Sequence, residues 1–122
     1  MSLQSRLVAA GLSATAAAAI QGTVANGLVA TGTTQATALP LGADNNDFLT
    51  VPAGTGALLP AMNPGDDITV YNGGANALLI YPPVGGQIKG LGTNAGYSLA
   101  TATPLCYVVC ISPLQYVASQ AA

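Results

Sequence analysis

Few side chains in this sequence could carry out acid–base or nucleophilic chemistry. The 122 residues include no histidine, which removes the commonest general base and the Ser-His and Cys-His nucleophilic pairs. Lys89 could in principle act as a base, but it lies in a glycine-rich turn, Gly85–Gly90, where we expect an exposed charge. The sequence therefore predicts a protein that is not an enzyme, with no catalytic residues and no cofactor.

Two clusters of polar side chains could bind a cation or exchange protons. Asp66 and Asp67 follow Pro64-Gly65 at the start of an expected strand, where a carboxylate caps the turn. The run from Asp44 to Asp47 offers the oxygen donors that calcium prefers, but it lacks the ligand spacing, the glycine and the distal glutamate of an EF-hand loop. We interpret both clusters as polar turns and predict no metal ligands, with a cation at Asp44–Asp47 left as the alternative.

The two cysteines, Cys106 and Cys110, lie in one apolar run. An extended strand holds them about 13 Å apart, at about 3.3 Å per residue. A disulfide needs Cα atoms within about 7 Å of each other. We therefore expect two buried, reduced thiols, which fits synthesis in a reducing cytoplasm.

Charge is scarce along the whole chain. Only 5 % of the residues are charged, Arg6 and Lys89 are the only cations, and the net charge is −2. Two cations cannot neutralise the roughly six to ten phosphates that useful nucleic-acid affinity requires, so we exclude nucleic acid as a partner. Because 51 % of the residues are hydrophobic, a free monomer would expose apolar surface that normally marks an interaction site. The composition predicts an oligomer or a subunit of a larger assembly.

The longest apolar stretch, from Leu7 to Ile20, is too short for a membrane span. It falls below the roughly 20 residues that a spanning helix needs, and Gly11 and Ser13 interrupt it. The stretch also has weak features of a signal peptide, with Arg6 before it and a small-residue site among its alanines. One arginine and an alanine-rich core are feeble signals, so we expect no membrane partner, with secretion as the alternative.

Residues 1–43 predict a helical segment followed by an extended arm. Helix is expected only over residues 2–21, where Gly11 separates two short helices that would be marginal alone in water. Residues 23–43 are rich in Thr, Ala and Gly and indicate an arm laid along a partner, with one strand over 35–39. We expect the arm to make contacts outside its own β domain through five apolar anchors: Leu3, Leu7, Val8, Leu12 and Ile20.

Residues 44–122 predict a mainly β domain. Short apolar runs are separated by Gly- and Pro-rich turns about every 8–12 residues, which is typical of a small antiparallel sandwich or barrel of jelly-roll type. The clearest expected hairpin pairs residues 68–71 with 77–81. The run 105–112 is apolar on both faces and predicts a central strand that is covered on both sides. The expected strands are 48–51, 57–59, 67–71, 77–81, 87–89, 97–100, 105–112 and 115–118.

Three stretches of the chain resemble a family of small structural proteins of tailed bacteriophages. They are TTQATAL at 33–39, VPAGTGALLP at 51–60 and, most recognisably, VYNGGANALLIYPPVGGQI at 70–88. The resemblance covers about residues 33–118 and does not include the alanine-rich residues 1–22. It implies a virion component of sandwich or barrel type, such as a capsid decoration (cement) protein, a class that commonly forms trimers where capsomers meet.

The resemblance and the composition together predict a homotrimer that binds the major capsid protein or another virion protein. Such a protein is made in the host cytoplasm, needs no catalysis and can rely on weak contacts because it binds many identical sites. A trimeric tail-fibre or tail-tip receptor-binding component is the alternative, with Tyr71 and Tyr81 beside the expected hairpin loop as its aromatic tip. A bacterial surface β-protein is a third possibility and would require removal of the N-terminal segment.

Overall fold

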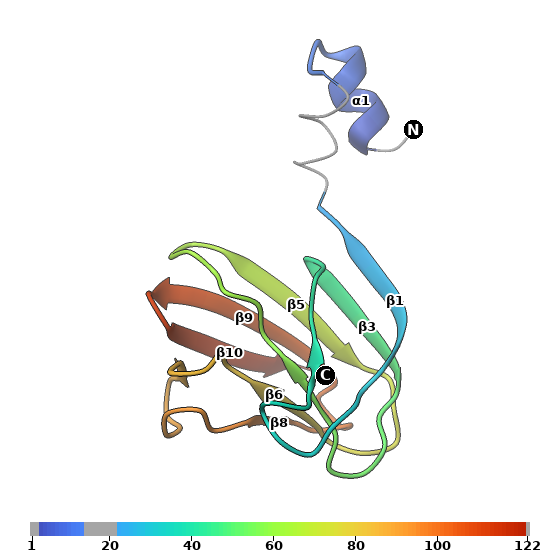
Figure 1. The fold of residues 1–122 in the computed structure, drawn as a ribbon. Coiled ribbons are helices and arrows are strands. Elements are labelled where there is room, and N and C mark those ends of the chain that lie inside the picture. The colour runs from blue at the N-terminus through green and yellow to red at the C-terminus, as the bar shows by residue number, and fades with distance from the viewer. Residues whose placement is uncertain (1–2, 14–21, 122) are drawn as a thin grey trace.

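Ten short strands and one short helix form the described part of the chain, residues 3–13 and 22–121, in this computed structural model (Figure 1). Each of the eight strands expected after residue 44 is confirmed, with ends shifted by at most three residues. The elements are α1 (Leu3–Ala9), β1 (Val24–Val29), β2 (Leu39–Pro40), β3 (Asn45–Thr50), β4 (Gly56–Leu58), β5 (Asp67–Asn72), β6 (Leu78–Tyr81), β7 (Gln87–Ile88), β8 (Tyr97–Leu99), β9 (Leu105–Ser112) and β10 (Gln115–Ala121).

The strands form two sheets that enclose one core, in a sandwich-like arrangement. The six-stranded sheet has the order β1-β3-β5-β9-β10-β7, and the four-stranded sheet has the order β2-β4-β6-β8. From β1 to β9, successive strands alternate between the two sheets. The chain therefore winds around the core. A strand that returns to a sheet can then run in the same direction as the previous strand of that sheet.

This winding makes most of the strand pairs parallel. Five of the eight pairs are parallel, and the antiparallel ones are β5–β9, β9–β10 and β6–β8. The prediction of a mainly β, two-sheet domain is confirmed, but the antiparallel, jelly-roll-like arrangement is wrong. Turn residues mark the end of a strand whether the chain then folds back or crosses to the other sheet, so the sequence pattern does not distinguish these outcomes.

The hairpin expected between residues 68–71 and 77–81 is also wrong, because β5 and β6 lie in different sheets. The buried side chain of Asn72 organises the crossing. Its Nδ2 donates to the carbonyl oxygens of Asn76 (2.9 Å) and Leu99 (3.1 Å), and its Oδ1 accepts from the Gly74 N–H (3.0 Å). The tight antiparallel hairpin is β9–β10 instead, turning at Pro113-Leu114.

The core lies between the sheets and takes alternate residues from the strands. Val70 and Val108 enter it from the six-stranded sheet, Leu78 and Ile80 enter it from the four-stranded sheet, and all four are fully buried. Each such side chain contributes about 1.5–3 kcal/mol relative to an exposed one. The alternation along these strands therefore contributes to holding the two sheets together.

Most of the stretch expected as an extended arm, residues 23–43, joins the sandwich. β1 pairs with β3 at one edge of the larger sheet, β2 pairs with β4 at one edge of the smaller sheet, and Ala30 and Leu41 are buried in the core. The strand expected over 35–39 is replaced by β2. Strand β1 was missed because its Asn26-Gly27 pair is typical of a turn; Gly27 has φ of 72° and falls at a shift of register. The domain boundary between residues 43 and 44 remains a prediction.

Helix α1 ends where the sequence predicts the first interruption. The Gly11 N–H donates to the Val8 carbonyl (3.0 Å) and the Leu12 N–H to the Leu7 carbonyl (3.1 Å), which is the Schellman pattern. Gly11 adopts the left-handed φ of 110° that this motif requires. Figure 1 shows α1 standing apart from both sheets.

The second expected helix, over residues 13–21, lies outside the described residues except for Ser13. Among the residues that the structure describes, no helix is long and apolar enough to cross a membrane.

Candidate interaction surface

Strand β9 buries one face and exposes the other. Its inward side chains, among them Cys106 and Val108, are fully buried, whereas Leu105 is 39 %, Tyr107 49 % and Ile111 51 % exposed. The strand lies between β5 and β10 in the larger sheet. The prediction of a central strand is confirmed, but the prediction of cover on both sides is wrong for the described chain.

Neighbouring strands extend this exposed surface. Tyr71 of β5 is paired with Leu105, and Val117 of β10 is paired with Val109, so these side chains point outward together. We name the resulting group the outer apolar face: Tyr71, Leu105, Tyr107, Val109, Ile111 and Val117. Four of these six side chains are more than a third exposed. Neighbouring exposed apolar side chains of this kind make the surface a candidate interaction site.

A carboxylate lies on the outer apolar face. The Tyr107 hydroxyl donates to Asp67 Oδ2 at 2.5 Å, which joins the start of β5 to the middle of β9. This hydrogen bond, and then the negative charge of Asp67, raise the pKa of Tyr107. A second acid, Asp47 of β3, is in register with Tyr71 and lies on the same side of the sheet. The sandwich's one cation, Lys89, is exposed and follows β7 at the opposite edge, as expected for a solvated charge.

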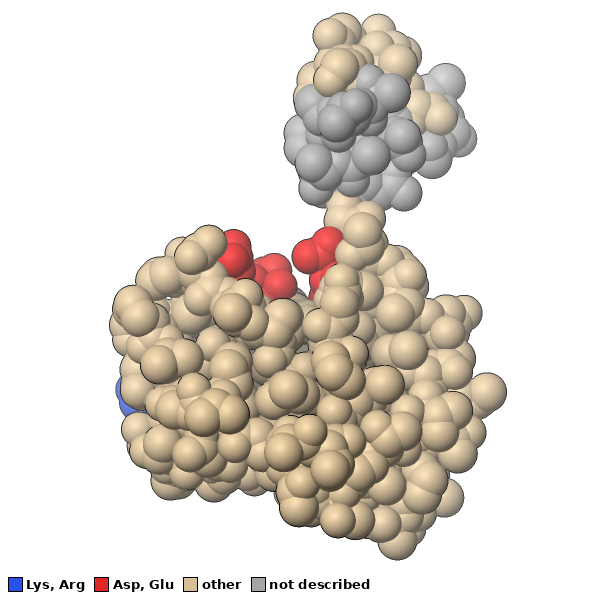
Figure 2. Space-filling model, viewed as in Figure 1, with Lys and Arg blue, Asp and Glu red and all other residues tan. Residues whose placement is uncertain are grey.

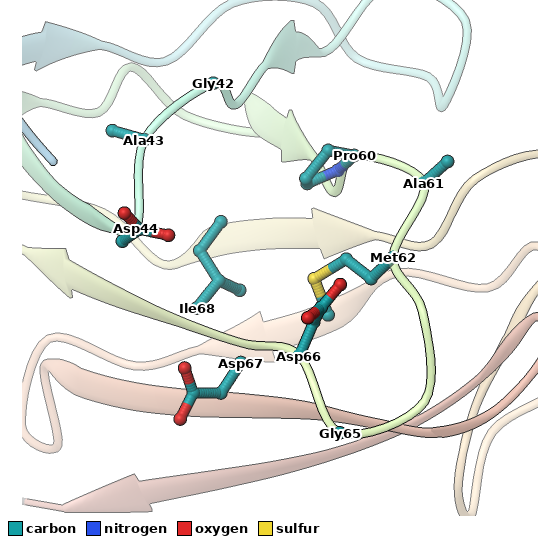
Figure 3. Close-up of a pocket in the computed structure, with 10 residues that line it drawn as sticks. All are labelled: Gly42, Ala43, Asp44, Pro60, Ala61, Met62, Gly65, Asp66, Asp67 and Ile68. Atoms are coloured by element: carbon teal, nitrogen blue, oxygen red, sulfur yellow. The ribbon is translucent and has the colours of Figure 1, made fainter. Parts of the chain in front are cut away.

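An open pocket of about 390 Å³ lies next to Asp67 (Figure 3). Asp44, Asp66 and Asp67 line it together with apolar side chains, and Figure 2 shows acidic side chains gathered around a notch at one end of the sandwich. The carboxylates already have partners. Asp44 Oδ2 accepts from the Thr23 N–H (2.8 Å) and hydroxyl (3.1 Å), and Asp66 Oδ2 accepts from the Asn63 N–H (2.9 Å). The turn-capping role is thus confirmed for Asp66.

The run from Asp44 to Asp47 does not form a loop that could surround a cation. Residues 45–47 belong to strand β3, so neighbouring side chains point to opposite faces of the sheet. Asn46 points inward and is 3 % exposed, whereas Asn45 is exposed. The interpretation as a polar turn is therefore wrong for most of this run. Among the described residues, no three Asp, Glu, His or Cys side chains are grouped so that they could hold a metal ion.

The two cysteines behave as expected. Cys106 and Cys110 are both free and fully buried on the inner face of β9. Burial raises the pKa of the Cys106 thiol to about 11, and a backbone hydrogen bond involving Ser119 acts weakly in the opposite direction. Both thiols are therefore packed as small apolar groups rather than exposed as nucleophiles.

Of the five expected arm anchors, the structure places Leu3, Leu7, Val8 and Leu12 in or just after α1. Leu7 and Leu12 are half-buried at the end of α1, and Val8 is 42 % exposed. Leu3 begins the helix, and Ile20 lies outside the described residues. Their role as anchors stays a prediction. The sequence does not predict the outer apolar face, because the run 105–112 is apolar at every position except Ser112 and fits burial on both faces as well as on one.

Comparison with known proteins leaves the function to be argued from this surface. The chain matches no family model, no curated protein and no solved structure. The outer apolar face is accordingly the feature on which a functional proposal rests.

Proposed function

We propose that this chain is a structural protein of a bacteriophage virion, and specifically a capsid decoration protein that stabilises the shell as a homotrimer bound between capsomers. The observation that carries the proposal is the outer apolar face on β5, β9 and β10. The resemblance of residues 33–118 to small phage structural proteins supports its assignment to a virion.

The physical properties of the face suit a protein that works by docking. It lies on paired strands inside a sheet, so little chain has to be ordered when a partner binds and the entropic cost of association is small. The six side chains of the face are uncharged, so the desolvation cost of its burial falls on the neighbouring carboxylates Asp67 and Asp47 alone. Many identical contacts on a symmetric shell then make modest individual affinities sufficient.

The alternative, a receptor-binding component of the tail, has less support. Its aromatic tip requires Tyr71 and Tyr81 to flank one hairpin loop, but they belong to strands of different sheets. The Tyr81 ring also lies against Gly56 and Gly96 rather than projecting freely. Of this pair, only Tyr71 is well exposed, at 44 %.

The test is the position and copy number of this chain in intact particles. Virions of the phage that encodes it are purified on a density gradient, the chain is quantified by mass spectrometry, and its density is located by cryo-electron microscopy. We expect copies in multiples of three on the outside of the capsid shell. Density confined to the tail would favour the alternative, and absence of the chain from purified virions would overturn the proposal.

A further inference from the structure

The chain contains two asparagines that are followed directly by glycine, Asn26-Gly27 and Asn72-Gly73. Asparagine loses its side-chain amide most readily in this dipeptide. The backbone nitrogen of the glycine can attack the side-chain carbonyl carbon of the asparagine, because glycine has no Cβ to obstruct ring closure. Since the two pairs have the same local chemistry, the tertiary structure decides which of them reacts.

Asn26-Gly27 lies exposed in an irregular part of the edge strand β1. The register of β1 on β3 shifts here, so Asn26 and Gly27 together stand opposite the single residue Asp47. They form a bulge, in which the extra residue lies outside the ladder. Both residues are exposed, and the Asn26 side chain forms no hydrogen bond with the described part of the chain. A Cβ on Gly27 would meet no atom within 4 Å, so the space beside the attacking residue is open.

Asn72-Gly73 is held in place by the sandwich. Asn72 is 2 % exposed, and its side-chain amide takes part in three hydrogen bonds. The attacking group is also occupied, because the Gly73 N–H donates to the Phe48 carbonyl oxygen (2.8 Å). A Cβ on Gly73 would lie 2.8 Å from that same oxygen, so the backbone is closely packed here. Reaction at Asn72 therefore requires the structure to open locally first.

We propose that Asn26 is a site of spontaneous deamidation in the folded protein and that the fold protects Asn72 from the same reaction. The Gly27 nitrogen bonds to Asn26 Cγ and gives up its proton, the side-chain nitrogen leaves as ammonia, and a succinimide ring remains. Water then opens the ring at either carbonyl. Attack at the side-chain carbonyl gives aspartate, attack at the main-chain carbonyl gives isoaspartate, and each product carries a new carboxylate.

The new charge falls beside an existing one. Asn26 lies on the outer side of the larger sheet, because its predecessor Ala25 is in register with the inward-facing Asn46. Asp47 lies on the same side of β3, so deamidation places two carboxylates on neighbouring strands, where like charges are destabilising. Isoaspartate also inserts a methylene group into the backbone, which disturbs the register of β1 on β3. Deamidation therefore weakens the attachment of this edge strand.

Incubation of the native protein at mildly alkaline pH, with a reductant present, tests the proposal. Alkaline pH favours the reaction because the attacking amide must lose its proton. Samples are digested with pepsin at acid pH, where the reaction is slow. Mass spectrometry then measures conversion at each site, and enzymatic methylation identifies isoaspartate. We expect conversion at Asn26 to be at least about tenfold faster than at Asn72, since opening around Asn72 breaks several buried hydrogen bonds.

The same incubation in guanidinium chloride is the control, because unfolding exposes both pairs and should make their rates similar. Asn26→Gln is the matched variant, since the longer side chain closes the corresponding ring far more slowly, and it should remain unmodified at this position. Equal rates at the two sites in the native protein would overturn the proposal, as would reaction at both sites in denaturant with none at Asn26 in the folded state. Aspartate without isoaspartate would also contradict it, because a succinimide gives both products.

Hydrogen exchange measures the effect of the modification on β1. After conversion, the amides of β1 should exchange faster, whereas those of β9, which lies between two other strands, should keep their rates. Asn26→Asp supplies the charge without the additional methylene group and should show a smaller increase. Unchanged exchange in β1 of the converted protein would refute the weakening of the edge strand.

Discussion

Asn72 shows how one polar side chain fixes the path of the chain. It is 2 % exposed and lies at the end of β5, where the chain leaves the larger sheet. Its side chain bonds to the loop at Gly74 and Asn76 and also to the Leu99 carbonyl of β8 in the smaller sheet. A buried polar group with all its partners satisfied ties the two sheets together at this edge.

Replacing Asn72 with alanine should therefore be costly. We expect Asn72→Ala to lower the free energy of unfolding by about 3 kcal/mol, because three hydrogen bonds are lost and buried backbone groups are left unpaired. Urea denaturation followed by circular dichroism measures the change. Asn63→Ala is the matched control, because Asn63 is exposed, and it should change stability by less than about 0.5 kcal/mol. Similar effects of the two substitutions would contradict the role given to Asn72.

The Cys106 thiol makes stability depend on alkaline pH. Its pKa in the folded protein is raised by burial to about 11, whereas an unfolded cysteine titrates near about 8.5. Because the folded state favours the neutral thiol, its contribution to stability is complete below the unfolded pKa and is lost as the pH rises through the folded pKa. In the presence of a reductant, the free energy of unfolding should fall between about pH 8.5 and 11.

The control for this prediction is Cys106→Ala. Tyrosines also titrate in this range, so the quantity to compare is the slope of unfolding free energy against pH rather than its value. The slope should be shallower in the alanine variant. Identical slopes in the two proteins would mean that the thiol is not responsible.

At the scale of the elements, the winding of the chain brings strands unusually close at glycine positions. Gly56 opens β4, which pairs in parallel with β6. A Cβ on Gly56 would lie 2.5 Å from the Leu79 carbonyl oxygen and 2.8 Å from Tyr81 Cε2. The carbonyl belongs to the paired strand and cannot move without breaking the ladder, so this position requires glycine.

Substitution of this glycine should weaken the smaller sheet. We expect Gly56→Ala to lower the free energy of unfolding by about 1–3 kcal/mol, the usual cost of overpacking. Gly92→Ala is the control, because a Cβ there meets no atom within 4 Å, and its effect should stay within about 0.5 kcal/mol. Thermal and urea denaturation of both variants gives the comparison. A Gly56→Ala protein as stable as the control would show that the sheets are less tightly apposed than described.

At the scale of the whole molecule, low charge and exposed apolar surface favour assembly. The net charge of −2 gives little repulsion between copies, and the outer apolar face and α1 both lack cover in the described part of a single chain. We predict that the purified protein is a trimer at micromolar concentration. Size-exclusion chromatography with light scattering should give three times the chain mass of 11.9 kDa. A homogeneous monomer under these conditions would contradict the prediction.

The sequence alone determined the local features of this protein. Proline and glycine between short apolar runs marked where eight strands begin and end, because these residues limit the backbone to turn conformations whatever the rest of the chain does. The left-handed Gly11 ended the first helix for the same reason. The spacing of Cys106 and Cys110 placed both thiols on one face of a strand, since side chains alternate along extended chain.

Only the tertiary structure decided which strands are neighbours and which faces stay open. A turn of given composition can return the chain to the same sheet or carry it across the core, and here it crosses eight times between β1 and β9. Parallel pairing follows from that winding, and no local feature of the sequence predicts it. The apolar pattern of β9 likewise fits burial on one face or on both. Which of the two occurs depends on how many layers pack against the sheet. Because two sheets leave the outside of the larger one uncovered in the described part of the chain, Leu105, Tyr107 and Ile111 face outward, and this is the surface that we propose as the docking site.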